Sequence, residues 1–138
     1  MRIKLAVAIA AAGILLAAVP LFAHHAFGAE FDDKRPVKLQ GKVTKVEWIN
    51  PHSWITIEVK GADGKLTSWM IEAAAPNALL RRGWTKESLP IGTEIIADGF
   101  QAKDGANRAN GSVITFKDGK KLFVGSSNTG APEYVEKK

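Results

Sequence analysis

Three histidines are the residues of this sequence best suited to chemistry near neutral pH. His24 and His25 are adjacent near the start of the chain, and His52 follows an Asn-Pro pair. Imidazole is the only side chain whose ordinary pKa lies close to neutrality, and it is the commonest metal ligand in proteins. The sequence contains no cysteine, which excludes a disulfide framework, a cysteine nucleophile, Cys-ligated zinc and an iron–sulfur cluster.

A leader segment precedes the histidine pair and determines which groups that pair can offer. Two cations at the start of the chain are followed by an uninterrupted apolar run over residues 5–19, and the small residue Ala23 comes soon after. This order is typical of a secretory signal peptide, here residues 1–23. A retained membrane anchor is the alternative, but a spanning helix needs about 20 apolar residues. We expect cleavage after Ala23, which leaves His24 as the first residue of a periplasmic or secreted protein without stable membrane insertion.

A copper site is the chemistry that these histidines predict. The α-amine and the imidazole of His24 can chelate one metal ion, while His25 and His52 add two further imidazoles. Nitrogen donors suit Cu(II), which also stands highest in the Irving–Williams order, and an amine with imidazoles is the donor set of a histidine brace. Three carboxylates close by in sequence can add oxygen atoms or hydrogen-bond the ligands: Glu30, Asp32 and Asp33. The alternative is a chain end that binds nothing and a His52 that only caps a turn.

Tryptophans and arginines form a second candidate binding surface. Trp54 lies in a predicted strand, and Trp84 follows Arg81 and Arg82 at the end of a predicted helix. OB-folds bind extended oligomers through aromatic side chains that stack on them, so an exported protein could bind a peptide or a glycan here. Core packing is the alternative, because aromatic side chains dominate the stability of a small barrel. Core packing is the expectation for Trp48 and Trp69.

Strands must position these residues, because most of the chain alternates between apolar and polar side chains. The pattern predicts strands over residues 37–49, 53–60, 66–72, 94–102, 111–116 and 121–124. One helix is predicted over residues 76–82, where Pro76 suits the first turn and Gly83 the end. Three strands, a helix and two or three more strands is the order of an OB-fold. We therefore expect an all-β, OB-like antiparallel barrel of five to six strands, with an open antiparallel sheet as the alternative.

The same pattern predicts the domain organisation. Residues 24–36 carry charge without a sustained period and are expected to form an extended N-terminal arm. Residues 37–125 are expected to form the OB-like domain, and residues 126–138 a flexible tail.

The first predicted strand contains an irregularity. Its apolar face changes parity between Val43 and Val46. A slip of one residue moves every following side chain to the other face of a sheet, so the sequence predicts a β-bulge near Thr44 beside a kink at Gly41.

Five motifs carry a resemblance that covers nearly the whole mature chain. They are HHAF at residues 24–27, EFD at 30–32, NPHSW at 50–54, PNALLRRGW at 76–84 and KDGANRANG at 103–111. In this order they resemble a family of small exported bacterial proteins that is catalogued as a domain of unknown function. The chain departs from that family at Ala26, Ala74 and Ala75, none of which is a histidine. The resemblance implies an exported domain similar to OB-like barrels, with no established reaction.

Charge and motif content narrow the function classes. The formal net charge of +5 is spread along the chain without a basic block, which does not predict nucleic acid as a partner. The sequence has no Gly-x-Ser-x-Gly elbow and no P-loop. An exported metal-binding accessory protein, with copper as the first choice of ion, is therefore the leading hypothesis. The alternative is an exported OB-like interaction module that binds a peptide, glycan or protein partner without metal; a copper oxidase is a third hypothesis, and no catalytic residue is assigned.

Overall fold

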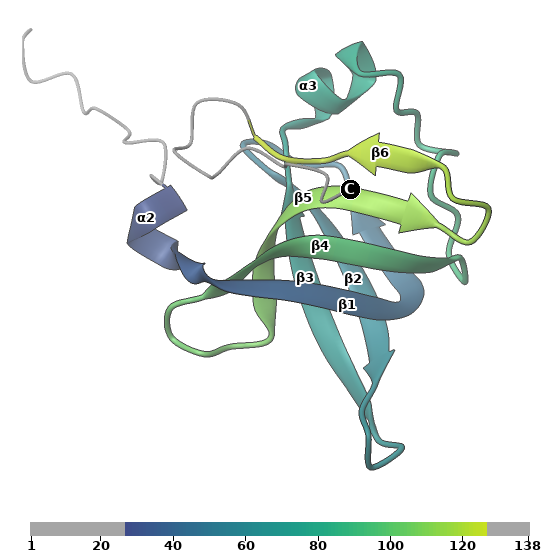
Figure 1. The fold of residues 1–138 in the computed structure, drawn as a ribbon. Helices are drawn as coiled ribbons and strands as arrows, with labels where there is room; N and C mark the ends of the chain where they lie inside the picture. The colour runs from purple at the N-terminus through teal and green to yellow at the C-terminus, as the bar shows by residue number, and fades with distance from the viewer. Residues whose placement is uncertain (1–26, 127–138) are drawn as a thin grey trace, which may run out of the picture.

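A computed structural model describes residues 27–126, which form one sheet that curls into a ring (Figure 1). The described elements are α2 (Phe27–Glu30), β1 (Phe31–Glu47), β2 (Ser53–Lys60), β3 (Leu66–Ala73), α3 (Pro76–Arg81), β4 (Glu94–Ala102), β5 (Arg108–Phe116) and β6 (Lys121–Phe123). The strand order is β3-β2-β1-β4-β5-β6, and β3 also pairs with β5. The predicted signal peptide, the histidine pair and all of the predicted tail after its first residue lie outside the described residues.

The predicted β-rich, OB-like architecture is confirmed. Five strands close a barrel-like ring, β6 lies on its edge, and α3 connects β3 to β4 as expected. The strands β2 and β4 have the predicted bounds. β2 alternates between buried and more exposed residues, and β4 follows a Pro-Ile-Gly turn and ends before a polar loop. One pairing differs from an all-antiparallel barrel: β3 and β5 run parallel where they close the ring.

The prediction of an extended arm before residue 37 needs a correction. Residues Phe27–Glu30 form a helical turn, and β1 already begins at Phe31. This early part of β1 pairs with β4, opposite Phe100 and Ala102. A run of charged residues gives this part of the strand no apolar alternation, so the sequence pattern does not predict it. Aromatic contacts on the outside of the sheet hold it in place.

The long strand β1 belongs to both halves of the ring. Gly41 is the Cα partner of Val59 on β2 and of Ile95 on β4. A Cβ atom at Gly41 would lie 2.5 Å from the carbonyl oxygen of Glu58, so only glycine allows the two strands to approach this closely. The β1–β2 register shifts between Val43 and Lys45, which confirms the predicted bulge.

The helix α3 closes one end of the ring. Proline occupies its first turn, and Gly83 follows it with a φ of +86°, as predicted for a helix stop. The backbone amide of Trp84 donates to the carbonyl of Leu79 at 3.1 Å, which turns the chain back toward the core.

Two apolar clusters stabilise the fold. The main core includes Val43, Ile55, Ile57, Ile71, Leu79, Ile95, Ile114 and Val124. A smaller cluster joins Phe27, Phe31 and Ala102, with Phe100 packed against it. Within residues 27–126, no helix is long and apolar enough to cross a membrane.

Candidate functional site

A buried polar cluster lies where the ring closes. Glu72 on β3 and Asn110 on β5 are Cα partners across the parallel contact, and they are 7% and 2% exposed. The Nδ2 atom of Asn110 donates to Oε1 of Glu72 at 3.2 Å. His52, just before β2, places its Nδ1 atom 3.4 Å from the same carboxylate oxygen. The fold thus brings together three polar side chains from three separate segments.

This cluster lies on the outer face of the sheet. Ile71 and Ala73, the neighbours of Glu72 along β3, both belong to the main core, and successive side chains of a strand point to opposite faces. Phe100 is the Cα partner of Asn110 on the next strand, and the Phe27 ring packs edge-on against it with centroids 5.5 Å apart. The turn α2 therefore folds over the outside of the sheet beside the polar cluster.

Burial dominates the electrostatics of Glu72. Desolvation raises the pKa of its carboxyl above the ordinary value of 4.5, and His52 and the Asn110 hydrogen bond oppose that effect. Glu30 raises the same pKa further and Arg108 lowers it. The guanidinium of Arg108 lies 3.9 Å from Glu30 and also lies above the Phe31 ring. Glu30 and Arg108 are thus the charged neighbours of the cluster.

One acceptor in the cluster lacks a donor. The Oδ1 atom of Asn110 is buried and has no hydrogen-bond partner within the described part of the chain. Buried polar atoms are nearly always paired, and an unpaired one costs about 1–3 kcal/mol. The arrangement therefore provides an acceptor that a ligand or a water molecule could satisfy.

The structure brings only part of the predicted metal set together. His52 meets Glu72 and also lies 3.5 Å from the Ser126 hydroxyl, whereas His24 and His25 lie outside the described residues. Of the predicted carboxylates, Glu30 lies near the cluster. Asp32 and Asp33 line a separate hollow beside α2. The Oδ1 atom of Asp32 accepts a hydrogen bond from the Lys34 amide at 3.0 Å. Among residues 27–126, no group of three His, Asp or Glu side chains is arranged to hold a metal ion.

The predicted aromatic and basic surface needs a correction at Trp84. Trp84 is 2% exposed and its Nε1 atom donates to the Phe123 carbonyl at 3.2 Å, so it packs in the core rather than on a surface. Arg82 donates to the Gly125 carbonyl at 2.6 Å, and Arg81 is exposed. Trp54 is half-buried in β2, where its Cα partners are Glu47 and Glu72. This places Trp54 on the outer face beside the polar cluster.

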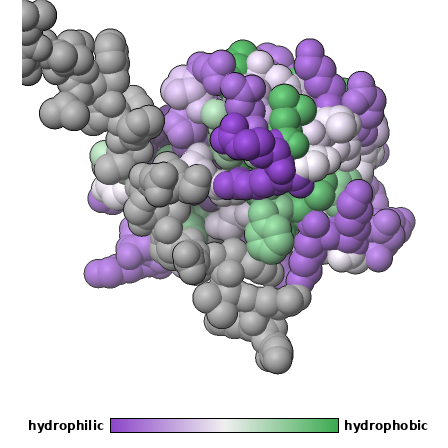
Figure 2. Space-filling view, turned by 90° about the horizontal axis from the view of Figure 1, so that it is seen from above, coloured by the Kyte–Doolittle hydropathy of each residue, from purple (hydrophilic) through white to green (hydrophobic). Residues whose placement is uncertain are grey.

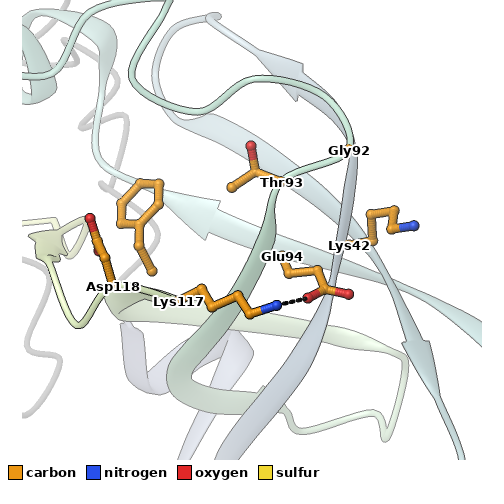
Figure 3. A pocket seen from close by; sticks show the side chains of 7 residues that line it. Lys42, Gly92, Thr93, Glu94, Lys117 and Asp118 are labelled. Carbon is orange, nitrogen blue, oxygen red and sulfur yellow. Dashed lines mark ion pairs between the residues drawn. The ribbon is translucent and has the colours of Figure 1, made fainter.

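A hollow of about 520 Å³ lies at the other end of β4 and β5. Lys117 turns toward Glu94 there, with nitrogen and oxygen 3.8 Å apart (Figure 3). None of the lining residues is buried: Lys42, Gly92, Thr93, Glu94, Phe116, Lys117 and Asp118. Exposed ion pairs contribute little free energy, so this hollow has no polar group held in place for a ligand.

Comparison with known proteins gives a match to a family model. Residues 11–112 match the sequence model of a family of unknown function, DUF6152. Neither a curated protein nor a solved structure gives a significant match.

Proposed function

The chain belongs to DUF6152, a family of unknown function, and we propose that it is an exported metal-binding protein whose site joins the mature N-terminus to His52. Copper is the expected ion. One observation carries the proposal: His52 does not merely cap a turn, because its Nδ1 atom lies 3.4 Å from a buried carboxylate. A nitrogen and an oxygen donor thus lie side by side on the outer face of the sheet.

The position of α2 supports a contribution from the chain start. Phe27 packs on Phe100, and Phe100 is the strand partner of Asn110 in the polar cluster. His25 precedes Phe27 by two residues, and two residues span at most about 7 Å. The predicted N-terminal ligands are therefore tethered to a point beside the cluster.

The donor set explains the choice of copper. An α-amine and imidazoles are nitrogen ligands, and nitrogen with oxygen in a tetragonal arrangement suits Cu(II). Each donor must be free of its proton to bind the ion, so affinity is expected to fall as the pH is lowered.

A titration of the mature protein tests this function. The protein beginning at His24, with its N-terminus verified by mass spectrometry, should bind one Cu(II) per chain more tightly than a free His-His peptide. His52→Ala should weaken binding by at least about tenfold, because loss of even an indirect support of a metal site costs that much. Glu58→Gln, at an exposed position on β2, is the matched control and should bind as the wild type.

Two results would contradict the proposal. Binding no tighter than that of the peptide would leave only an incidental chelate at the chain end. Equal affinity of wild type and His52→Ala would remove His52 from the site.

A second function, partner binding without metal, is favoured by a separate apolar hollow. It measures about 550 Å³ and is lined by Val46, Trp48, Lys86, Leu89, Pro90 and Ile91. Ile91 is 64% exposed at its rim. On the face seen from the α3 side, apolar residues lie in small patches between hydrophilic ones (Figure 2), and scattered exposure of this kind is ordinary. The hollow is thus a more specific indication than the surface as a whole.

Selection from a random peptide library tests the second function. Apolar peptides selected by the wild-type protein should lose binding to Ile91→Glu and keep it to Leu66→Glu, a residue equally exposed at 64% on another part of the surface. Peptides that bind both variants alike, or no selected peptides, would count against it.

A further inference from the structure

We infer that Glu72 supplies a carboxylate oxygen directly to the bound ion, so that the site prefers Cu(II) to Cu(I); this inference rests on the proposed function. The sequence patterns gave Glu72 no role. Its place in the fold, beside His52 and Asn110, is what assigns one.

The spacing of the two donor atoms fits ligation of a single ion. Imidazole nitrogen and carboxylate oxygen ligands lie about 2.1 Å from a divalent ion such as zinc, so two of them on one ion are about 3.0 Å apart at a right angle and about 3.4 Å apart at a tetrahedral angle. His52 Nδ1 and Glu72 Oε1 are 3.4 Å apart. This spacing matches the tetrahedral value and exceeds the right-angle value by about 0.4 Å, so tetragonal Cu(II) would require the two atoms to approach by that amount.

The surroundings of Glu72 leave its charge poorly compensated. Its ion-pair partner among the described residues is His52. Arg108 acts on it from a greater distance and forms its own ion pairs with Glu30 and Asp104, at 3.9 Å and 3.7 Å. A buried charge is costly unless it is paired or coordinates a metal. A divalent ion on Glu72 would supply the missing positive charge.

Asn110 gives the independent indication of a ligand. Its Nδ2 atom holds Oε1 of Glu72, and the Oδ1 atom of the same amide is buried without a donor. A water molecule bound to the ion would supply a hydrogen to that oxygen, because metal-bound water is a strong donor and buried acceptors are normally satisfied.

The identity of the donors determines the preferred oxidation state. Soft sulfur ligands select Cu(I), whereas imidazole and carboxylate suit harder divalent ions. The chain has no cysteine and two methionines. Met1 belongs to the predicted signal peptide, and Met70 lies on β3 two residues before Glu72, on the same face of the sheet. With Glu72 as a ligand, the site combines nitrogen and charged oxygen, a set that favours Cu(II).

Glu72→Gln tests the inference, because glutamine keeps the shape and removes the charged ligand. We expect its affinity for Cu(II) to fall at least about tenfold and its Cu(II) electron paramagnetic resonance spectrum to change, while its affinity for Cu(I), measured without oxygen against a competing chelator, stays within about twofold. Glu58→Gln, at an exposed position on β2, is the matched control and should behave as the wild type. Glu72→Asp should retain part of the preference for Cu(II), which covers the case in which the glutamine variant does not fold.

The outcomes separate the two proposals. Wild type that binds Cu(II) through His52, together with an unchanged Glu72→Gln, overturns the role of Glu72 and leaves the proposed function standing. An equal loss of Cu(I) and Cu(II) affinity overturns the oxidation-state preference. Wild type that binds neither ion overturns both proposals.

Discussion

Asn110 and Glu72 are joined by a hydrogen bond of 3.2 Å between their side chains, across the parallel contact that closes the ring. The same two residues are backbone partners, so this side-chain hydrogen bond on the outer face lies directly at the strand contact that closes the ring. Polar groups with good partners on a sheet surface are ordinary, but a carboxylate and an amide that are both buried there are not. The cluster therefore makes several measurable predictions.

Removal of the Glu72 charge should change how stability depends on pH. The pKa of Glu72 is raised in the folded protein, mainly by burial. The folded state therefore keeps a proton that the unfolded state releases near the ordinary pKa, and stability falls as the pH rises from the ordinary value of 4.5 through the folded pKa. In melts with a chelator present, the Tm difference between Glu72→Gln and wild type should shift in favour of the variant over that range. A constant difference, or a similar shift in Glu58→Gln, would contradict this.

Phe27→Ala should weaken metal binding without unfolding the ring. Phe27 is buried against Phe31 and Phe100, outside the main core, so its loss frees the chain start from the sheet. We expect at least about tenfold lower affinity for Cu(II), by analogy with other losses of ligand positioning. Faster hydrogen exchange should be confined to α2 and the start of β1. Phe123→Ala, at an exposed phenylalanine, is the control; an effect of equal size there would rule out a specific role for α2.

Trp84 should matter for stability and not for binding. Trp84→Phe leaves the Phe123 carbonyl without its indole donor, a loss of about 1 kcal/mol, and Trp84→Ala should cost about 3–5 kcal/mol as a large deletion in the core. Chemical denaturation measures both values, and Cu(II) titration should show no change in the phenylalanine variant. A clear loss of binding in Trp84→Phe would restore this tryptophan to the site.

Gly83→Ala should destabilise the end of α3. Its φ of +86° is costly for a residue with a Cβ atom, although nothing lies within 4 Å to obstruct that atom. We expect a loss of about 1 kcal/mol, which lowers the Tm of a domain of this size by about 4–8 °C. Gly28→Ala is the control, because Gly28 has open space and lacks a positive φ. Equal melting temperatures for Gly83→Ala and wild type would show that this backbone position tolerates alanine.

Local patterns predicted much of the fold. Clean alternation set the bounds of β2, the flanking turn and polar loop set those of β4, and a parity change located the bulge beside Val43. The start of β1 was missed because four charged residues follow Phe31, and such a run shows no apolar period. Its pairing with β4 is a long-range contact that local sequence does not encode.

The candidate site was predictable only in part. The position of His52 after Asn-Pro marked it as unusual, but nothing in the sequence distinguished Glu72 from the polar residues that alternate outward along other strands. Asn110 was even less visible, since the loop motif that contains it is explained by turn chemistry, as the contact of the Asp104 side chain with the Ala106 amide illustrates. Only the parallel pairing of β3 with β5 brings these residues together.

That pairing is also short, and this has a mechanical consequence. The backbone partners along it are Met70 with Arg108, Ile71 with Ala109, and Glu72 with Asn110, whereas β4 pairs with β1 along most of the length of β4. The pairing of β3 with β5 is therefore expected to separate first when force is applied to the ring. A ligand bound by side chains of both β3 and β5 would link the two strands across this contact. Its binding would therefore increase the resistance of the whole ring to opening.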